Sequence, residues 1–436
     1  MRRGGTDSYV PGHGDASYDV EHYGLALGYK LIGNRIDGDA TLRCRARANL
    51  EFLELDLHAL RPAKVFLNGR SASFTHRNQR IHVKLGTTIP AGEVFDLRVK
   101  YAGSPRPVPS RVLGTSGWEE LDDGVIVAAQ PHGAPSWFPC NDRPDNKATY
   151  SIAVSAPSDY YVAVSGELVS SRRSGSATTW LYEQQSPMPT YLATVQIGRY
   201  EVVELEADVP LRVIGPADRD EDAFAAGFGR QPEMLAFFVK LFGDYPFASY
   251  TAVITDDDLE IPLESQGLST FGRNFVSDDW DAVRLVAHEL SHQWFGNAVT
   301  LTKWKDIWLH EGFACYAEWL WSEESGSKSA DERAAIHHAR VADDDGPDLL
   351  LGDPGAELMF DDRVYKRGAL TLHALRAEVG DETFFAILRG WVAEHTGGNV
   401  TTEQFIAHAA GVADRDLTEL FDAWLFSVEL PELPKL

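Results

Sequence analysis

The chain has 436 residues, of which 44% are apolar and 11% aromatic, a globular composition too long for one ordinary hydrophobic core. Its 40 Lys and Arg stand against 65 Asp and Glu, a formal net charge of −25, which argues against general binding to a nucleic-acid phosphate backbone. No run approaches eighteen consecutive apolar residues, so no membrane-spanning helix is expected.

The three cysteines, Cys44, Cys140 and Cys315, are an odd number without paired spacing. They predict no disulfide framework and fit a reducing compartment. Two arginines near the N-terminus are not followed by an apolar stretch, which argues against a secretory signal. We therefore expect a cytoplasmic protein, with secretion after removal of a signal from a precursor as the alternative.

The first half of the sequence alternates apolar and polar residues over short stretches, a pattern typical of half-buried strands. Asn68-Gly69 lies between two such stretches and is a strong hairpin signal. Short strands at this density predict an antiparallel β sandwich or saddle-shaped sheet, in a first domain spanning residues 1–203. The predicted strands are residues 40–46, 52–57, 95–101, 148–154, 161–164 and 191–197.

The pattern changes after about residue 205, from a period of two residues to the helical period. Residues 220–243 predict one helix, with Gly243 as its C-cap. Residues 209–215 and 251–263 predict short strands. Later helices are predicted at residues 365–379, 382–394, 402–410 and 417–426. We therefore predict an α+β protein whose second domain, residues 204–436, is mainly helical with a small sheet.

The strongest chemical signal is the run His288-Glu-Leu-Ser-His292. Residues four apart share one face of a helix, so both imidazoles can bind one metal ion. Glu289 projects about 100° further round the helix, where it can reach a water molecule without binding the metal. Residues 306–318 predict a second helix that offers Glu311 as a third ligand. Two His and one Glu with an open fourth position form a catalytic site for one zinc ion; an amphipathic helix with two unrelated histidines is the alternative.

Three segments together resemble the aminopeptidase N and leukotriene hydrolase family of zinc metallopeptidases, which are gluzincins. They are the helix from His288 to Asn297, the segment from Trp308 to Ala314 and the run from Tyr365 to Gly368. The resemblance covers nearly the whole chain. It implies a saddle-shaped β domain before a thermolysin-like catalytic domain. Larger family members continue into a helical domain, so in this short two-domain form we expect a more open cleft that accepts peptides of varied length.

The resemblance also implies roles for individual residues of the catalytic domain. The zinc ligands of the family fall on His288, His292 and Glu311, and the general base that acts on zinc-bound water falls on Glu289. Tyr365 matches the tyrosine that stabilises the oxyanion of the tetrahedral intermediate. A buried tyrosine at the start of a helix is the alternative for Tyr365.

The exopeptidase motif of the family, Gly-x-Met-Glu-Asn, falls on Ile261 to Ser265, where only the acidic residue is kept. Glu264 is therefore expected to anchor the free α-amino group of a peptide. Gln130 is expected to be a second contact from the β domain, with a solvated loop glutamine as the alternative. Because this motif departs from the family pattern, the sequence does not indicate a preferred N-terminal residue.

Three further residues lie on the second helix with Glu311. Glu318 follows two helical turns later on the same face, where the family also has an acidic residue, and a hydrogen bond to a ligating imidazole is predicted; an exposed helix glutamate is the alternative. Cys315 is expected to be a small packed side chain, because the ligand set is already full. His310 is expected to be a surface or packing residue, not a ligand.

These features predict a zinc aminopeptidase whose partners are peptides with a free N-terminus, without nucleic acid or membrane. A thermolysin-like endopeptidase would share the zinc ligands without needing an amine anchor. An inactive peptide-binding protein would be expected to lack a ligand or the base, and none is missing. The sequence does not indicate the oligomeric state.

Overall fold

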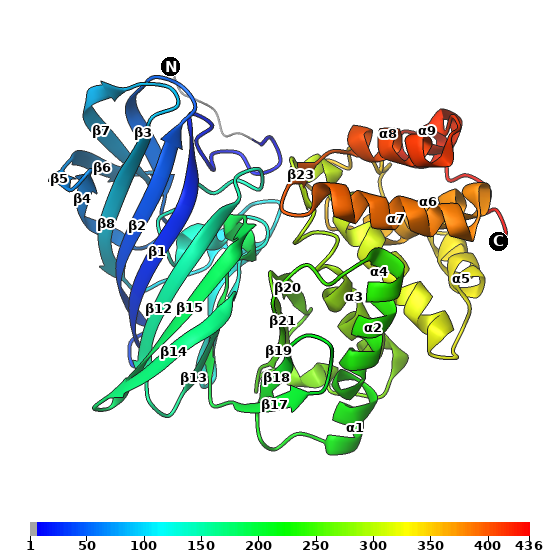
Figure 1. The fold of residues 1–436 in the computed structure, drawn as a ribbon, viewed down its shortest axis with the longest axis horizontal. Helices are drawn as coiled ribbons and strands as arrows, with labels where there is room; N and C mark the ends of the chain where they lie inside the picture. The colour runs from blue at the N-terminus through cyan, green and yellow to red at the C-terminus, as the bar shows by residue number, and fades with distance from the viewer. Residues whose placement is uncertain (1–6) are drawn as a thin grey trace.

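The computed structural model describes residues 7–436 and divides into a β-rich part and a mostly helical part (Figure 1). The β-rich part comes first in the chain, and the helical part follows from about residue 220. The predicted α+β fold class is confirmed. The two parts pack side by side, and the chain passes between them near residue 200.

Over residues 7–436 the largest sheet has eight strands, which form one face of the β-rich part (Figure 1). Neighbouring strands are antiparallel except for one central pair, in which residues 22–28 of β1 run parallel to residues 149–155 of β12. The sheet is therefore mixed, not purely antiparallel. In spatial order its strands are β14 (Glu167–Ser174), β15 (Ala177–Met188), β12 (Ala148–Pro157), β1 (Tyr18–Lys30), β2 (Arg35–Ala46), β8 (Val94–Gly103), β4 (Arg61–Leu67) and β5 (Arg70–Ser71).

Two smaller sheets complete the β-rich part. One is formed by β3 (Leu50–Asp56), β7 (Arg80–Ile89) and β6 (Ser73–Arg77); the other by β13 (Tyr161–Val164), β16 (Val195–Gly198), β11 (Gly124–Ala128), β10 (Thr115–Leu121) and β9 (Val108–Pro109). The predicted turn at Asn68-Gly69 joins β4 to β5, and both residues have positive φ, as a tight hairpin turn requires. The β10–β11 hairpin matters most for function, because β11 leads directly to Gln130.

The small predicted sheet of the second half is formed by β17 (Glu201–Leu205), β18 (Leu211–Gly215), β19 (Tyr250–Ile254), β21 (Leu268–Phe271) and β20 (Leu263–Ser265). Strand β20, which carries Glu264, is at the edge of this sheet, so Pro262 beside it removes no ladder hydrogen bond. The predicted domain boundary after residue 203 falls inside β17, which pairs with β18. A short parallel pair, β22 (Thr300–Leu301) and β23 (Asn399–Val400), lies beside the helices.

The helices of the second half enclose a central helix, α4. Their bounds are α1 (Glu221–Ala226), α2 (Gln231–Phe242), α3 (Trp280–Ser291), α4 (Trp308–Glu324), α5 (Ala330–Ala342), α6 (Asp362–Val379), α7 (Asp381–His395), α8 (Thr402–Ala413) and α9 (Thr418–Leu425). Helix α4 is buried over almost its whole length. It crosses α6 backbone to backbone: a Cβ on Gly368 would lie 2.6 Å from the Cα of Gly312.

Several predicted elements differ from the observed ones. Within residues 251–263, β19 ends at Ile254 and no strand follows before β20, and the predicted helix from His288 to Asn297 ends at Ser291. Residues 220–243 form two helices, α1 and α2, because Gly227 leaves the helical region with ψ of −85° and a 3-10 turn follows it. Gly243 does cap α2, with φ of 99°. The predicted strand 191–197 begins with a 3-10 turn, η2 (Thr190–Leu192), and only β16 is extended. Tyr191 is buried within this turn.

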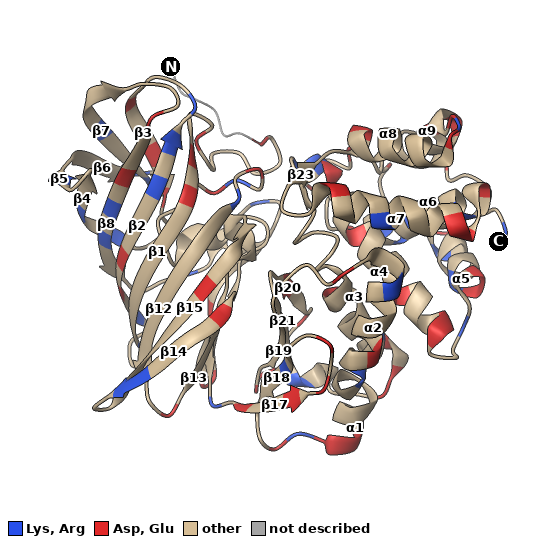
Figure 2. Cartoon of the chain, viewed as in Figure 1, with Lys and Arg blue, Asp and Glu red and all other residues tan. Residues whose placement is uncertain are grey.

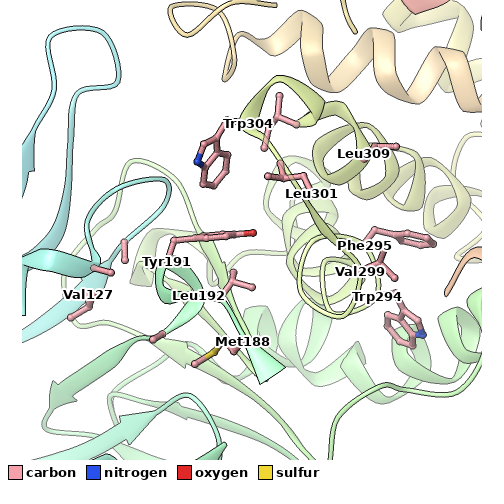
Figure 3. Packing of buried hydrophobic residues seen from close by; sticks show 14 of the residues in the cluster. Val127, Met188, Tyr191, Leu192, Trp294, Phe295, Val299, Leu301, Trp304 and Leu309 are labelled. Carbon is pink, nitrogen blue, oxygen red and sulfur yellow. The ribbon is translucent and has the colours of Figure 1, made fainter. Parts of the chain in front are cut away.

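The hydrophobic core continues from the β-rich part into the helical part (Figure 3). Tyr191 meets Trp304 edge to face, with ring centroids 4.9 Å apart. Figure 3 also shows Leu192 and Met188 on the same side as Tyr191, opposite Leu301. The ammonium of Lys147 donates hydrogen bonds to backbone carbonyls of residues 297 and 298, just beyond the helix of the His-Glu-x-x-His run. These contacts fix the β-rich part against the helix that carries two of the predicted metal ligands.

Charged side chains are distributed unevenly over the two parts. Figure 2 shows Lys and Arg bands on β2 and β8, whereas acidic residues mark the start of α1. All three cysteines are buried and free, as expected without a disulfide framework. Within residues 7–436, none of the helices combines the length and apolar character needed to cross a bilayer.

Candidate active site

Helices α3 and α4 bring three ligand atoms together. His288 lies in the last turn of α3, and His292 follows the helix while keeping helical backbone angles, so the two imidazoles point the same way. The Nε2 atoms of His288 and His292 are each 3.4 Å from Oε2 of Glu311 on α4. All three side chains are buried.

This arrangement fits a zinc ion. Two ligands held about 2.0–2.1 Å from a tetrahedral zinc lie roughly 3.3–3.4 Å apart, which matches the two observed distances. The Nδ1 of His292 lies 3.0 Å from the carbonyl oxygen of Phe295, which can only accept a hydrogen bond. That bond places the proton of His292 on Nδ1 and leaves the Nε2 lone pair free to bind a metal.

Glu318 orients the other imidazole. Its Oε1 lies 2.7 Å from Nδ1 of His288, and its Oε2 accepts a hydrogen bond of 3.1 Å from Arg284. Burial by itself raises the pKa of the Glu318 carboxyl, but Lys366, Arg284 and the bond from His288 outweigh it and hold the pKa well below its usual range. The carboxylate is therefore ionised and accepts the Nδ1 proton of His288, which fixes the tautomer for metal binding.

Glu289 faces the same space as the ligands without joining them. Burial raises the pKa of its carboxyl to about 8, although His288 and His292 act in the opposite direction. Its Oε2 is buried and has no hydrogen-bond partner within residues 7–436. A buried oxygen without a partner is costly unless a ligand or water molecule satisfies it. A bound dication would lower this pKa again, toward the range of a base at neutral pH.

Glu264 and Gln130 meet across the boundary between the two parts of the molecule. Gln130 follows β11 in the β-rich part, and its amide donates a 2.6 Å hydrogen bond to Oε1 of Glu264 on β20. A carboxylate oxygen of Glu264 also lies within 4.8 Å of ligand atoms of Glu289 and His292. Burial raises the pKa of the Glu264 carboxyl. An acidic side chain therefore lies directly beside the candidate metal ligands, on the side that faces the β-rich part.

Tyr365 enters the site from the first turn of α6. Its ring stacks loosely on His288, with centroids 6.0 Å apart and planes 24° apart. Burial raises the pKa of the Tyr365 hydroxyl well above its ordinary value, so the group keeps its proton. Gly368 lies one turn later on the same helix, and its backbone packs against Gly312, the residue after Glu311 on α4.

His310 and Cys315 are both buried, and their contacts are those of packing residues. The Nε2 of His310 accepts the backbone N–H of Leu301 at 2.8 Å, so its lone pair is already used. Burial lowers the pKa of His310 to about 3, which keeps the ring neutral. Cys315 is fully buried and accepts a 3.5 Å contact from the ammonium of Lys366, and burial raises the pKa of its thiol to about 12.

A cavity of about 770 Å³ joins the predicted site residues. Its wall includes all eight residues that the sequence indicates as ligands, base, anchors or orienting groups. The sequence gave no functional role to five other charged wall residues: Glu119, Glu260, Arg284, Asp362 and Lys366. Arg284 could have been found, because it precedes His288 by four residues and so shares its helix face. No local signal marked Glu119, whose exposure to the cavity depends on strand pairing.

Comparison with known proteins agrees with this geometry. The sequence profile described as "Peptidase M1 N-terminal domain" matches residues 19–192, and the profile described as "Peptidase family M1 domain" matches residues 227–424. The chain is similar to a probable M1 family aminopeptidase of Encephalitozoon cuniculi, with 29% identity over 337 residues, which are 69% of this chain and 38% of that protein. The chain thus spans less than half the length of this curated relative.

Two solved structures match nearly end to end. The M1 zinc metallopeptidase of Deinococcus radiodurans is 32% identical, with a TM-score of 0.88 over 98% of this chain and 99% of that one. A mutant of that metallopeptidase bound to the substrate Tyr-Ser-Ala is 31% identical, with a TM-score of 0.88 and the same coverage.

Proposed function

Because the chain belongs to peptidase family M1, we propose that it is a zinc-dependent aminopeptidase, which removes the N-terminal residue from peptides. The pair formed by Glu264 and Gln130 carries this proposal. A buried carboxylate beside a metal site can bind the ammonium group of a free N-terminus, and a charge-assisted hydrogen bond of this kind fixes which peptide bond reaches the metal. Peptides with a free N-terminus are therefore the proposed substrates.

One zinc ion would be held by His288, His292 and Glu311. A second group of possible ligands, formed by Glu264, Glu289 and His292, uses the same His292 and therefore does not form an independent site. When bound, zinc supplies a Lewis acid that polarises the scissile carbonyl and lowers the pKa of water. The remaining chemistry belongs to the side chains of the protein.

Glu289 is the proposed proton carrier. Its unpartnered Oε2 accepts a proton from the attacking water and then gives that proton to the leaving amine, as general base and then as general acid. Tyr365, which keeps its hydroxyl proton, donates a hydrogen bond to the oxyanion that forms on the carbonyl oxygen. Glu264 and Gln130 hold the ammonium group while these steps occur.

The three buried, free thiols agree with a proposed site of action in a reducing compartment, the cytoplasm. This proposal is independent of the catalytic one.

The test compares an unblocked dipeptide with its N-acetylated form, on protein loaded with zinc. We expect hydrolysis of the free dipeptide only, loss of activity with a chelator, and recovery when zinc is added back. Glu289→Gln is expected to lower kcat by at least about 10²-fold with zinc still bound, since general acid–base catalysis contributes about that much or more. Glu324→Gln is the matched control, because Glu324 is an exposed glutamate at the end of α4.

The alternatives have distinct outcomes. Equal hydrolysis of the acetylated dipeptide would indicate an endopeptidase and remove the role of Glu264 as anchor. Zinc binding without hydrolysis of either substrate would indicate a peptide-binding protein. Full activity of Glu289→Gln would refute the proposed mechanism.

A further inference from the structure

Glu119 lies in the wall of the active-site cavity, on β10, the strand next to the edge of its five-stranded sheet. In the β10–β11 hairpin, Glu119 pairs with Ile126, and Gly117 pairs with Ala128. Directly paired residues of antiparallel strands share one face of the sheet, so Glu119, Ile126 and Ala128 face the cavity together. The chain then continues from Ala128 to Gln130, the proposed contact to the substrate amine.

The carboxylate of Glu119 has no partner. Within residues 7–436, no hydrogen bond or ion pair joins it to another side chain, and burial alone raises its pKa. The cations of the cavity wall are already engaged: Arg284 bonds Glu318 at 3.1 Å, and Lys366 contacts Cys315 and Asp362. A half-buried carboxylate without a counter-charge is stabilised by any cation that enters beside it.

The position of Glu119 suits the far end of a long side chain. Ile126 pairs with Glu119, and Gln130 follows Ile126 by four residue steps, which span at most about 13–14 Å. With the substrate amine held at Gln130 and Glu264, the long side chain of lysine or arginine extends further along this cavity wall toward Glu119 than a short side chain does. Ile126 and Ile261 supply apolar wall for the alkyl stem of such a side chain.

The rim of this end of the cavity is also acidic. The loop after β19 contains Asp256, Asp257, Asp258 and Glu260, of which Glu260 lines the cavity and Asp256 pairs with Arg273 at 2.6 Å. A hydrogen bond of 3.2 Å from the backbone N–H of Asp122 to Asp257 joins this loop to the turn of the β10–β11 hairpin. This bond places the acidic loop beside the hairpin, and the excess of carboxylates over arginines there favours the approach of cationic peptides.

We propose that Glu119 selects substrates whose N-terminal residue is arginine or lysine, by pairing with the cationic end of that side chain. This inference rests on the proposed aminopeptidase function and adds the class of the N-terminal residue. The nearby Glu120 points to the opposite face of β10 and is exposed, so it takes no part in the selection.

The test uses fluorogenic aminoacyl amides of arginine and of citrulline, which has almost the same shape without the charge, on the zinc-loaded full chain. We expect kcat/KM for arginine to exceed that for citrulline by about tenfold to hundredfold, the value of a hydrogen bond to a charged group. Glu119→Gln is expected to bring this ratio close to one, because arginine turnover falls more than citrulline turnover. Glu120→Gln is the matched control and keeps the ratio.

A calorimetric titration with free L-arginine and L-citrulline measures the same preference without turnover. Hydrolysis of both amides at equal rates, or a ratio that Glu119→Gln does not change, would overturn the role of Glu119. If neither amide is hydrolysed, the proposed function fails. In that case the titration still decides the inference: equal affinities for the two amino acids overturn it, and tighter arginine binding that depends on Glu119 supports it.

Discussion

Replacing Gly368 by alanine tests whether the contact between α4 and α6 sets the geometry of the active site. The new Cβ would lie 2.6 Å from the Cα of Gly312, where ordinary contact begins at 3.4 Å, so the two backbones must separate by at least 0.8 Å. The obstructing atoms are main-chain atoms, so no side chain can rotate away. Glu311 is next to Gly312 and Tyr365 is one turn before Gly368, so this separation moves the tyrosine away from the metal ligand.

The expected effects follow from this displacement. Overpacking of this kind costs about 1–3 kcal/mol of folding free energy, or roughly 2–12 °C in Tm for a part of this size. A displacement of about 1 Å in a catalytic group can cost up to about 10²-fold in rate, so we expect kcat to fall by about tenfold to hundredfold.

The assay combines kcat on an unblocked aminoacyl amide, zinc content and thermal unfolding. Gly411→Ala is the matched control, because Gly411 lies in α8 with open space around it, and alanine there should stabilise the helix by about 1 kcal/mol or less. Normal kcat and Tm in Gly368→Ala would refute the reasoning. A low Tm with normal kcat would show that the contact stabilises the fold without positioning Tyr365.

Two further predictions concern groups around the site. Glu318→Gln removes the carboxylate charge that accepts the proton of His288. Zinc affinity, measured by competition with a chromophoric chelator, should fall by about tenfold to hundredfold. An unchanged affinity would show that this hydrogen bond does not orient His288. His132 is buried, and burial lowers its pKa from 6.5 to about 4. The free energy of unfolding therefore falls as the pH drops from 6.5 to 4, because the unfolded chain takes up a proton that the folded chain does not. The loss of unfolding free energy between pH 7 and pH 4, measured by urea unfolding, should be about 3 kcal/mol smaller in His132→Gln. The same loss in both proteins would contradict this prediction.

The sequence predicts those features of the fold that depend on neighbouring residues. Alternation gives the strands, and the Asn68-Gly69 turn gives a hairpin, because both follow from local geometry. The parallel pairing of β1 with β12 joins segments more than 120 residues apart and leaves no periodic trace in either strand. The break at Gly227 was missed because one glycine in an otherwise helical pattern is often tolerated.

The same distinction applies to the site. The shared direction of His288 and His292 follows from the helical period alone. Glu264 and Gln130, 134 residues apart, meet only because the core packs the β-rich part against the helices, and the sequence indicated them only through the family resemblance. Glu119 was missed for a related reason: the face it presents is set by the register of the β10–β11 pair, which alternation in so short a strand does not fix.

The departure of residues 261–265 from the family motif also has a physical explanation. Gln293 and Asn297 follow α3 in the chain. Their side-chain amides donate hydrogen bonds to the backbone carbonyl of Ser265, at 3.2 and 3.0 Å. Because these bonds are made to the main chain of Ser265, the side chain at this position can change without moving β20. The carboxylate of Glu264 is held by the hydrogen bond from Gln130, which does not involve the neighbouring side chains of the motif. The motif can therefore lose its Gly, Met and Asn while the proposed anchor remains beside the candidate metal ligands.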